Sequence, residues 1–265
     1  MSRTVVVLGA TGLVGRTVLA ILEERAFPLA RVRALASDRG TARSVRFRGA
    51  DVAVEPATAE AFHGAELALF ATAAEPSREW EPVARAAGAR IVDLSSAFRQ
   101  CDDVPLVVPE VNGALLETRP VLVANPNCVA VPVAMALKPL EALGRLERVV
   151  VASYQSVSGA GAEALAELET GIRAGLEGPP PPRAGGLPAF AYNVVPWIDR
   201  FDDDGWTFEE RKIVNETRKL LARPELSVIP TAVRVPVRVG HAAAIVATFD
   251  RAVAVEAARE RWRRA

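Results

Sequence analysis

The sequence predicts an α/β protein in which a Rossmann-type doubly wound parallel sheet domain is followed by an α+β domain. In the first half, short β-branched runs alternate with helical patterns, as in a parallel sheet covered by helices on both faces. A glycine-rich turn joins the first strand to the first helix, which is typical of a dinucleotide-binding fold. The second half mixes strands and helices less regularly. We place the domain boundary at residue 128, giving domains 1–128 and 129–265.

The first half contains five predicted strands and two helical patterns. The order is a strand at Thr4–Leu8, a helix at Leu13–Arg25, strands at Val32–Ala36 and Leu67–Ala71, a helix that includes Pro82–Ala87, and strands at Arg90–Leu94 and Val121–Ala124. Each strand is short and bounded by Gly, Pro or polar residues.

The second half begins with a helical pattern and ends with one. The order is a helix at Val131–Leu143, a strand at Val149–Ser153, a helix at Gly161–Ala174, a stiff proline-rich loop at Gly178–Gly186, a helix starting near Thr207, strands at Val233–Val237 and Ala243–Phe249, and a helix at Val253–Arg264. Thr207 and Glu210 form the T-x-x-E pattern of a capping box, which satisfies backbone N–H groups at a helix start.

Composition excludes several functional classes. The 265 residues include 32 Lys+Arg and 32 Asp+Glu, and 50% are hydrophobic. This balance is ordinary for a globular domain and argues against a nucleic-acid partner, which usually requires a basic excess. No apolar run reaches the roughly 20 residues of a membrane span, so no membrane partner is expected. With two cysteines and no secretory signal, we expect a cytoplasmic protein; we predict no metal site.

The first candidate site is the turn Gly9-Ala10-Thr11-Gly12-Leu13-Val14-Gly15 between the first strand and the first helix. Small residues allow the backbone to approach a pyrophosphate, and the helix N-terminus offers N–H groups to it. The spacing is G-x-x-G-x-x-G, and tight turns also use glycine. Its place at the first strand–helix junction favours a dinucleotide site, with Gly9, Thr11, Gly12, Leu13 and Val14 as the cofactor-binding residues.

The end of the second strand bears on which nucleotide is preferred. Ser37 and Arg39 favour the 2′-phosphate of NADP, whereas Asp38 between them favours the ribose hydroxyls of NAD. A solvated polar turn is the alternative interpretation. We predict NADP as the cofactor.

The second candidate site is Asn125-Pro126-Asn127-Cys128, where a strand runs into a turn and a helix follows. Cys128 therefore lies at or beside a helix N-terminus, where the dipole and the N–H groups favour a thiolate. A thiolate is the form that attacks acyl carbons. A buried structural cysteine is the alternative, but the polar turn argues against it. Cys101 has no such setting.

Further candidates lie in the second half. His241 could be the proton partner of Cys128, although a lone histidine is more often structural. In the polar loop after the strand Val149–Ser153, Gln155 could donate to a carbonyl or oxyanion, and Ser158 and Gly159 could approach a cofactor. A Ser/Gly connector is the alternative interpretation of that loop.

Two basic residues complete the set. Arg99 follows the strand Arg90–Leu94, and Lys212 lies one helical turn after Glu209 on the same helix face. Such a Glu/Lys pair is usually a solvated surface pair.

Taken together, these motifs resemble aspartate-semialdehyde dehydrogenase, in the same order along almost the whole chain. The matching segments are GATGLVG, SSAFR at 95–99, VPEVN at 108–112, NPNC at 125–128, SYQSVSGAG at 153–161, AYNVVPWID at 191–199, the E-x-x-K of Glu209 and Lys212, and R-V-P-V…G-H ending at His241. The combination is far more specific than any one motif.

The resemblance implies a role for each matching residue. Cys128 matches the nucleophile that attacks β-aspartyl phosphate, and His241 matches the acid/base residue. Gln155 matches the residue that orients the substrate, Arg234 the one that binds its carboxylate, and Glu209 the one that receives its amino group. The phosphate-binding residues correspond to Arg99, Asn127 and Lys212.

The resemblance also sets broader expectations. It implies a homodimer that binds aspartyl phosphate, aspartate semialdehyde and phosphate. The family normally continues for several dozen residues after His241, so we expect this chain to lack the C-terminal part of the family fold. Two alternatives stay open: a related acyl-phosphate reductase of the N-acetyl-γ-glutamyl-phosphate reductase type, and a non-catalytic paralogue that only dimerises or binds.

Overall fold

The computed structural model describes residues 3–36 and 43–265. The chain divides into two compact units. The first comprises Met1–Val107 and Ala114–Pro126, and the second comprises Val108–Gly113 and Asn127–Ala265. The chain thus passes from the first unit to the second immediately before Asn127, and a short earlier segment also belongs to the second unit.

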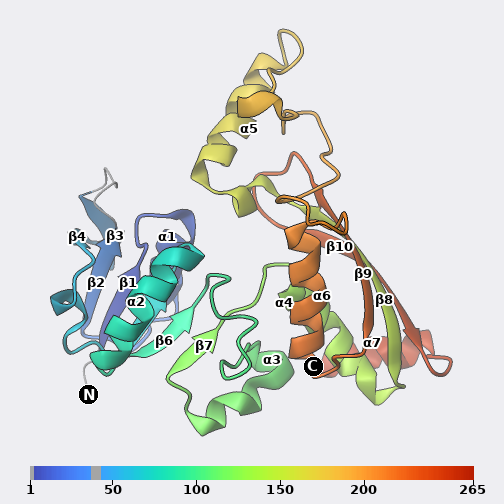
Figure 1. Ribbon diagram of the computed structural model, residues 1–265, viewed down its shortest axis with the longest axis horizontal. Helices are drawn as coiled ribbons and strands as arrows, with labels where there is room; N and C mark the ends of the chain where they lie inside the picture. The colour runs from blue at the N-terminus through green and yellow to red at the C-terminus, as the bar shows by residue number, and fades with distance from the viewer. Residues whose placement is uncertain (1–2, 37–42) are drawn as a thin grey trace. The chain divides into compact units, whose positions relative to one another are not determined.

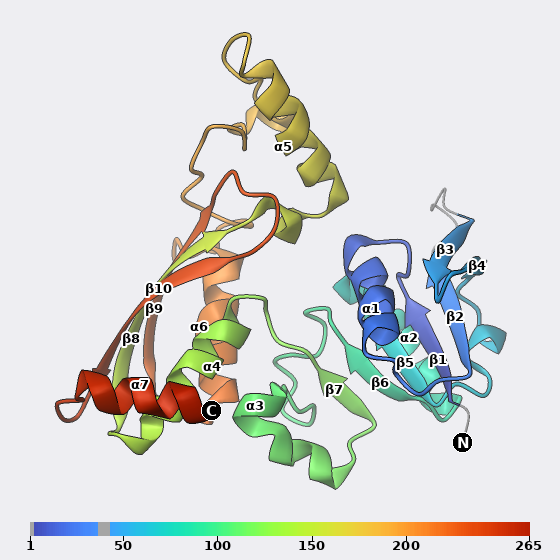
Figure 2. The ribbon, with the colours of Figure 1, turned by 180° about the vertical axis from the view of Figure 1, so that it is seen from behind.

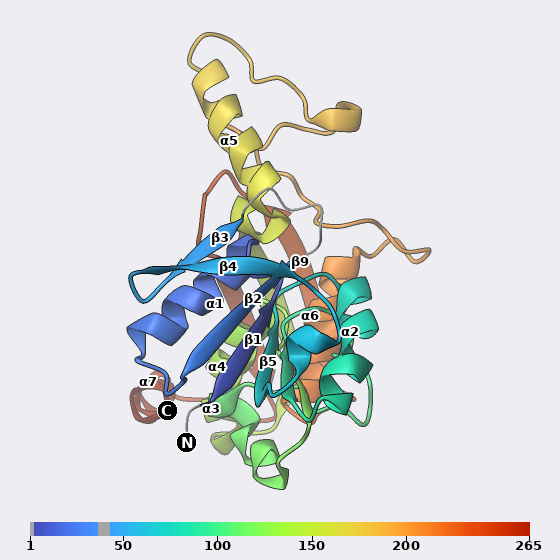
Figure 3. The same ribbon diagram turned by 90° about the vertical axis from the view of Figure 1, so that its left-hand side faces the viewer.

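The first unit is built on a seven-stranded sheet with the order β3-β4-β2-β1-β5-β6-β7. All its neighbouring strands run parallel except β3 and β4, which are antiparallel. The strands are β1 (Thr4–Leu8), β2 (Arg31–Ala36), β3 (Ser44–Phe47), β4 (Ala50–Pro56), β5 (Leu67–Phe70), β6 (Arg90–Asp93) and β7 (Leu122–Ala124). Figure 3 shows β2, β1 and β5 side by side in this order.

Helices cover both faces of this sheet, as the sequence predicts. Helix α2 (Ala74–Ala86) lies in front of the strands in Figure 1, and α1 (Leu13–Glu24) lies in front of them in the opposite view of Figure 2. Leu19 and Leu22 of α1 pack with Val5 and Val7 of β1 in one hydrophobic cluster. Because successive strand residues face opposite sides, Val6 and Leu8 belong to the other face.

The hairpin of β3 and β4 is absent from the sequence prediction. Its two-residue turn is Arg48-Gly49, and both residues have positive φ, 49° and 76°. Turns of this kind match the right-handed twist of paired strands. Val45 and Phe47 of β3 belong to the same hydrophobic cluster as α1, so the hairpin completes the core on that side.

The other predicted elements of the first half are present with slightly different ends, and three short helices are additional. The five predicted strands are confirmed within one residue at each end, and α2 begins at Ala74 and includes Pro82. Short helices that the sequence pattern does not predict are η1 (Glu60–Phe62), α3 (Pro109–Asn112) and η2 (Gly113–Thr118).

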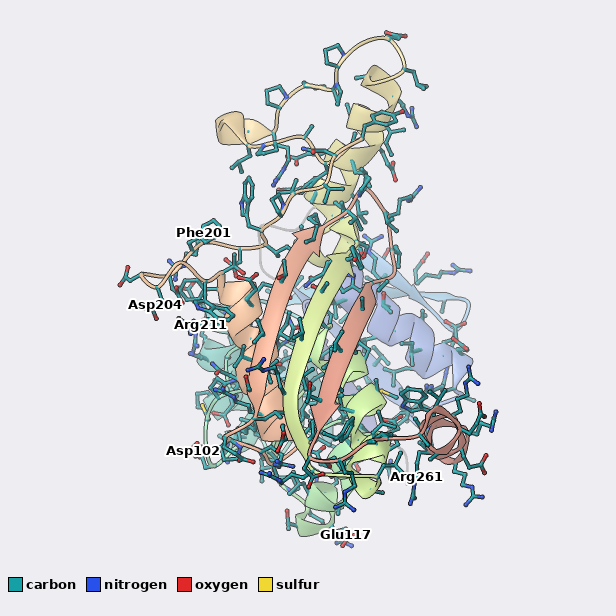
Figure 4. The ribbon with its side chains drawn as sticks, turned by 90° about the vertical axis from the view of Figure 1, so that its right-hand side faces the viewer. Asp102, Glu117, Phe201, Asp204, Arg211 and Arg261 are labelled. Atoms are coloured by element: carbon teal, nitrogen blue, oxygen red, sulfur yellow. The ribbon has the colours of Figure 1, made fainter. Side chains whose placement is uncertain are left out.

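The second unit is built on a three-stranded sheet with the order β10-β8-β9. Strand β8 (Leu146–Gln155) runs parallel to β9 (Ser227–Arg234) and antiparallel to β10 (Ala242–Phe249). Helix α6 (Phe208–Leu220) packs on β9 and α4 (Ala130–Leu137) packs on β10. The face that points to the viewer in Figure 4 has no helix in front of these strands.

The predicted strand Val233–Val237 is wrong in most of its extent. The strand begins at Ser227 and ends at Arg234, where its register with β8 ends at the pair Gln155 and Arg234. Pro230 lies inside it, which the sequence pattern disfavours. The position is tolerated because β9 is an edge strand, where a missing N–H need not leave a partner unbonded.

Several other predictions for this unit are confirmed. Thr207 Oγ1 accepts the N–H of Glu210 at 3.2 Å, and the Glu210 carboxylate accepts the N–H of Thr207 at 2.9 Å, so the capping box starts α6. The predicted helix Val131–Leu143 is α4 followed by the 3-10 helix η3 (Lys138–Ala142). The other helices are η4 (Val157–Ala160), α5 (Ala162–Ala174), η5 (Ala184–Gly186) and α7 (Val255–Arg264).

No helix within residues 3–36 and 43–265 is both long and apolar enough to cross a membrane.

Candidate active site

Cys128 and His241, 113 positions apart in the sequence, lie together in the second unit. The distance from Cys128 Sγ to His241 Nε2 is 3.2 Å. Cys128 is exposed and lies two residues before α4 begins at Ala130, as predicted for a cysteine beside a helix N-terminus. Cys101, in the first unit, forms no disulfide with it. The structure therefore pairs the predicted nucleophile with the predicted proton partner.

Asn127 takes up the first backbone N–H groups of the helix that follows it. Its Oδ1 accepts the N–H of Val129 at 2.8 Å and that of Ala130 at 3.2 Å. These two amides are therefore directed at Asn127, while the imidazole of His241 lies in hydrogen-bond contact with the Cys128 sulfur. The amide Nδ2 of Asn127 donates to Glu209 Oε1 at 2.8 Å, and its backbone N–H donates to Glu216 Oε2. Asn127 thus fixes the segment that contains Cys128 against α6.

Glu209 is the centre of a buried polar cluster, with only 6% of its surface exposed. Besides the bond from Asn127, its Oε1 accepts from Gln155 Nε2 at 3.3 Å, and its Oε2 contacts Lys212 Nζ at 3.4 Å. Gln155 Nε2 also lies 3.2 Å from Ser153 Oγ. In the Glu209/Lys212 pair the carboxylate is therefore buried, whereas both partners of a usual helical pair are solvated.

Asp199 is a second anionic partner of Lys212, at 3.0 Å. Burial alone would lower the pKa of Lys212, but the charge of Glu209 and the bond to Asp199 outweigh it, so the pKa is raised. Burial would raise the pKa of Asp199, but bonds from the Arg200 N–H and from Lys212 lower it overall. Lys212 is thus held as an ammonium and Asp199 as a carboxylate. Asp199 ends the AYNVVPWID segment but was not among the sequence candidates.

Arg234 ends β9 directly opposite Gln155 in the sheet register. Its Nη1 donates to the carbonyl oxygen of Ser156 at 2.6 Å, and its backbone forms a bridge with Val195. Burial lowers the pKa of the guanidinium, an effect that the charges of Glu209 and Cys128 oppose. An arginine keeps its charge under such shifts, so the site holds a buried cation.

His241 is held from its other ring nitrogen by Ser156. The N–H of Ser156 donates to Nδ1 at 3.0 Å, and Ser156 Oγ also lies 3.0 Å from Nδ1. Burial lowers the pKa of His241, the charge of Arg234 lowers it further, and the charge of Glu209 opposes both. Ser156 is fully buried and was not among the sequence candidates; its place between Gln155 and Ser158 in the quoted motif was the available signal.

Ser158 and Gly159 belong to the second unit. Ser158 Oγ is 3.0 Å from Ser156 Oγ. A Cβ at Gly159 would lie 3.1 Å from Arg234 Nη1 and 3.5 Å from the His241 ring, so the absence of a side chain allows both groups to pack there. Ser158 thus contacts Ser156, and Gly159 lies close to Arg234 and His241; the predicted cofactor contact stays a prediction.

A separate cavity of about 460 Å³ lies in the first unit, at the carboxyl ends of its central strands. It is lined by residues that follow or end β1, β2, β4 and β5, together with part of α2: Leu8, Gly9, Thr11, Gly12, Ala36, Pro56, Ala57, Ala71, Thr72, Pro76, Glu79 and Trp80. The carboxyl ends of the strands beside the point where the strand order reverses are the usual place of a ligand in such sheets.

The glycine turn fits a pyrophosphate at this cavity. Gly9 has a φ of +82°, and a Cβ there would overlap the carbonyl oxygen of Ala71. A Cβ at Gly15 would overlap the carbonyl oxygen of Gly9, so both glycines are required for the turn. No side chain caps α1 at Gly12, which keeps the helix N-terminus suitable for an anion.

The other predicted cofactor residues are placed differently. Leu13 and Val14 form the first turn of α1, have exposed side chains and are not among the residues that line the cavity. Ser37 and Arg39 lie outside the described residues.

Arg99 belongs to the first unit, unlike the other predicted substrate-binding residues. It is buried, and its Nη2 donates to the carbonyl oxygen of Leu94 at 2.9 Å. The turn before it is fixed by the buried carboxylate of Asp93, which accepts the hydroxyls of Ser77 at 2.7 Å and Ser95 at 2.8 Å.

Comparison with known proteins gives one consistent result. Residues 4–119 match the family model described as semialdehyde dehydrogenase, NAD binding domain, and residues 137–265 match semialdehyde dehydrogenase, dimerisation domain. An aspartate-semialdehyde dehydrogenase of Aquifex aeolicus is 40% identical over 264 residues, which cover 98% of this chain and 78% of the relative. One of Bacillus subtilis is 40% identical, covering 93% and 73%.

Solved structures agree with these relatives. The structure of aspartate semialdehyde dehydrogenase II from Vibrio cholerae complexed with ASA matches with a TM-score of 0.92 and 39% identity, covering 98% of this chain and 78% of that one. The predicted fold class is thereby confirmed, and the relatives support the main functional prediction over the related acyl-phosphate reductase. The chain is an oxidoreductase with an NAD(P)-binding domain and a dimerisation domain, and it belongs to the aspartate-semialdehyde dehydrogenase family.

Proposed function

We propose that this chain catalyses the NADP-dependent reductive dephosphorylation of β-aspartyl phosphate to aspartate semialdehyde, through a thioacyl intermediate on Cys128. This reaction serves the biosynthesis of lysine, threonine and methionine. The observation that carries the proposal is the 3.2 Å contact between Cys128 Sγ and His241 Nε2, in the same unit as the buried Glu209 and Arg234. The names of the relatives support the same substrate.

The proposed chemistry begins at the exposed sulfur of Cys128. The sulfur forms a bond to the acyl carbon, the bond from that carbon to the phosphate oxygen breaks, and phosphate leaves with the electron pair. The ring of His241 lies beside the sulfur and donates to the acyl oxygen when negative charge develops there. Reduced NADP, when bound, supplies the hydride that converts the thioester to the aldehyde level. Collapse of the resulting thiohemiacetal releases the aldehyde and restores the thiolate.

The substrate's charged groups are assigned to the buried cluster. Arg234 offers a guanidinium, whose planar fork suits the α-carboxylate, and Glu209 offers a carboxylate for the amino group. Gln155 orients the substrate from its place between them. Lys212, held as an ammonium by Asp199 and Glu209, attracts the phosphate together with Asn127. Arg99 is proposed as a phosphate-binding residue from the family resemblance alone.

The cofactor is assigned to the cavity beside the glycine turn. Gly9, Thr11 and Gly12 line it, and the N-terminus of α1, with Leu13 and Val14 in its first turn, favours the pyrophosphate. Preference for NADP over NAD rests on Ser37 and Arg39 in the sequence. Ser158 and Gly159 remain proposed cofactor-binding residues. Comparing kcat/KM for NADPH and NADH in wild type and in Arg39→Ala tests the preference: the variant should lose rate only with NADPH.

The reverse reaction gives the most direct test of activity. Purified protein is mixed with aspartate semialdehyde, NADP⁺ and phosphate, and NADPH is followed by its absorbance, with Cys128→Ala as the matched variant. We expect phosphate-dependent NADPH formation by the wild type and none by the variant. Equal rates would remove Cys128 from the mechanism. If both proteins are inactive, the alternative of a non-catalytic paralogue is favoured instead.

The dimerisation domain leads us to propose a homodimer that forms through the uncovered face of the β10-β8-β9 sheet. Val150 lies between Ile229 and Val246 in the register, and all three side chains are at least 40% exposed. Tyr154 lies further along the same face of β8. Such a contiguous apolar surface is typical of an interface.

Both cysteines are thiols, which fits the reducing cytoplasm in which we place the protein.

Sedimentation analysis of Val246→Asp tests this interface, with Val255→Asp as control. The two valines are equally exposed, at 65% and 64%, but Val255 lies on α7 and outside the sheet. We expect a dimer for the wild type and the control, and a monomer for Val246→Asp. A dimer in all three would place the interface elsewhere.

A further inference from the structure

Ser156 holds a rigid position at the end of β8, next to the segment that leads to His241. Three backbone bonds join the two segments: Val235 N–H to the Gln155 oxygen at 3.0 Å, Val157 N–H to the Val237 oxygen at 2.8 Å, and Ser158 N–H to the Arg238 oxygen at 3.0 Å. The direction of the Ser156 N–H is therefore fixed relative to the imidazole.

That N–H determines which ring nitrogen carries the proton. It donates to Nδ1 of His241 at 3.0 Å, so Nδ1 must present a lone pair. A neutral imidazole carries one proton, on the nitrogen that is not the acceptor. The proton is therefore on Nε2, and Nε2 lies 3.2 Å from the sulfur of Cys128.

The other two protonation states conflict with this geometry. Both the Nδ1–H tautomer and the imidazolium would direct a second hydrogen at the Ser156 N–H, and a backbone amide cannot rotate away. The ring packs against Gly159, whose Cβ would lie 3.5 Å from Cε1 and Nε2. Among the charged groups acting on the ring, Arg234 disfavours a positive imidazole and Glu209 favours it, and burial also disfavours it.

We propose that Ser156 is a positioning residue that holds His241 as the neutral Nε2–H tautomer, so that the imidazole is a hydrogen-bond donor to Cys128 and to the substrate oxygen and does not take the proton of the thiol. The thiol proton passes to solvent, which reaches the exposed Cys128. The assignment of the substrate oxygen rests on the proposed function; the state of the ring does not.

The state of the ring can be measured without substrate. Protein with ¹⁵N-labelled histidine contains two imidazoles, His63 and His241, and a His63→Gln variant assigns the signals. At pH 7 we expect a pyridine-like Nδ1 and a pyrrole-like Nε2 for His241. The same pattern is expected in Cys128→Ala, because the ring carries no proton that belongs to the thiol.

Two outcomes of this measurement would overturn the proposal. One is an Nδ1–H tautomer. The other is an imidazolium in the wild type that becomes neutral in Cys128→Ala, which is the behaviour of a thiolate–imidazolium pair. Either outcome would leave the proposed function intact if the wild type turns over and Cys128→Ala does not.

Variants of Ser156 separate its amide from its hydroxyl. Ser156 has a φ of −65°, so Ser156→Pro keeps the backbone conformation while a ring carbon replaces the N–H and displaces the imidazole. Ser156→Ala keeps the N–H. We expect the alanine variant to keep the Nε2–H tautomer. The proline variant should lose the tautomer preference, and its kcat should fall about 100-fold, the scale of a general acid, with KM little changed.

A wild-type tautomer and wild-type kcat in Ser156→Pro would refute the role of the amide, and equal loss in both variants would assign the effect to the hydroxyl instead. If the proline variant does not fold, the nitrogen signals of the wild type and of Cys128→Ala still decide whether His241 is the neutral Nε2–H tautomer that the proposal requires.

Discussion

Replacing Asn127 by Asp converts one of its side-chain hydrogen bonds into a repulsion and leaves two others intact. An Asp oxygen can still accept the N–H groups of Val129 and Ala130, but a carboxylate oxygen then faces Glu209 Oε1 where the amide Nδ2 now lies at 2.8 Å. At an effective dielectric constant of about 20, two unit charges at that distance repel by about 6 kcal/mol.

The repulsion is limited because the pair can take up a proton. Raising a carboxyl pKa from about 4 to 7 requires about 4 kcal/mol, which is less than the repulsion, so at pH 7 the two carboxyls share one proton. We therefore expect the free energy of unfolding to fall by about 4 kcal/mol at pH 7. The folded pKa lies above the unfolded one, so the native state binds more protons and the loss decreases as the pH is lowered. At pH 5 it should be about 1 kcal/mol.

The control is Asn127→Ala, which removes the cap and the donor without adding charge. A lost cap contributes about 1 kcal/mol and a lost bond to a charged group about 2 kcal/mol, independent of pH in this range. Urea unfolding followed by tryptophan fluorescence suits the measurement, because Trp197, Trp206 and Trp262 lie in the second unit. The alanine variant should be the more stable of the two at pH 7 and the less stable at pH 5. A loss in Asn127→Asp that is equal at both pH values would refute the reasoning.

Three further predictions concern Cys128, Arg234 and Thr207. Near neutral pH, Cys128 should react with iodoacetamide much faster than Cys101, because Cys128 is exposed and His241 Nε2 lies 3.2 Å from its sulfur; equal rates in peptide mapping would contradict an activated thiol. Arg234→Lys should raise KM for aspartate semialdehyde more than it lowers kcat, because a point charge replaces a planar fork; an unchanged KM would mean that the carboxylate binds elsewhere. Thr207→Ala should lower the free energy of unfolding by about 1 kcal/mol through loss of the capping box, as measured in urea, with no change expected if the box contributes nothing.

The sequence predicts the central fold because its strongest signals are local. The turn from Gly9 to Gly15 stands at a strand–helix junction, and the strands around it are continuous apolar runs. The hairpin of Ser44–Phe47 and Ala50–Pro56 has weaker signals, since its strands are only partly buried and its turn places Arg48 at positive φ. The strand Ser227–Arg234 was misplaced because Pro230 disfavours a strand unless the strand is known to lie at an edge, which is a property of the assembled sheet.

The residues of the candidate site also divide into those with a local sequence signal and those without one. Cys128 and His241 became candidates because their chemistry is distinctive and their motifs are well marked, and Arg234 became one through the family resemblance. Ser156, Glu216 and Asp199 were missed because each is brought to the site by a contact with a residue elsewhere in the sequence, namely His241, the Asn127 amide and Lys212. A matching motif includes Ser156 and Asp199, but it does not show which distant residue each one contacts.

Mass spectrometry of the protein after reaction with aspartate semialdehyde and NADP⁺ in the absence of phosphate tests the central claim most directly. Without phosphate to release it, the acyl group should remain on the enzyme, with at most one NADPH formed for each acylated site before hydrolysis. We predict an aspartyl adduct on the peptide that contains Cys128, absent from Cys128→Ala. An adduct on Cys101, or continued NADPH formation with no adduct at all, would contradict catalysis through the Cys128 sulfur.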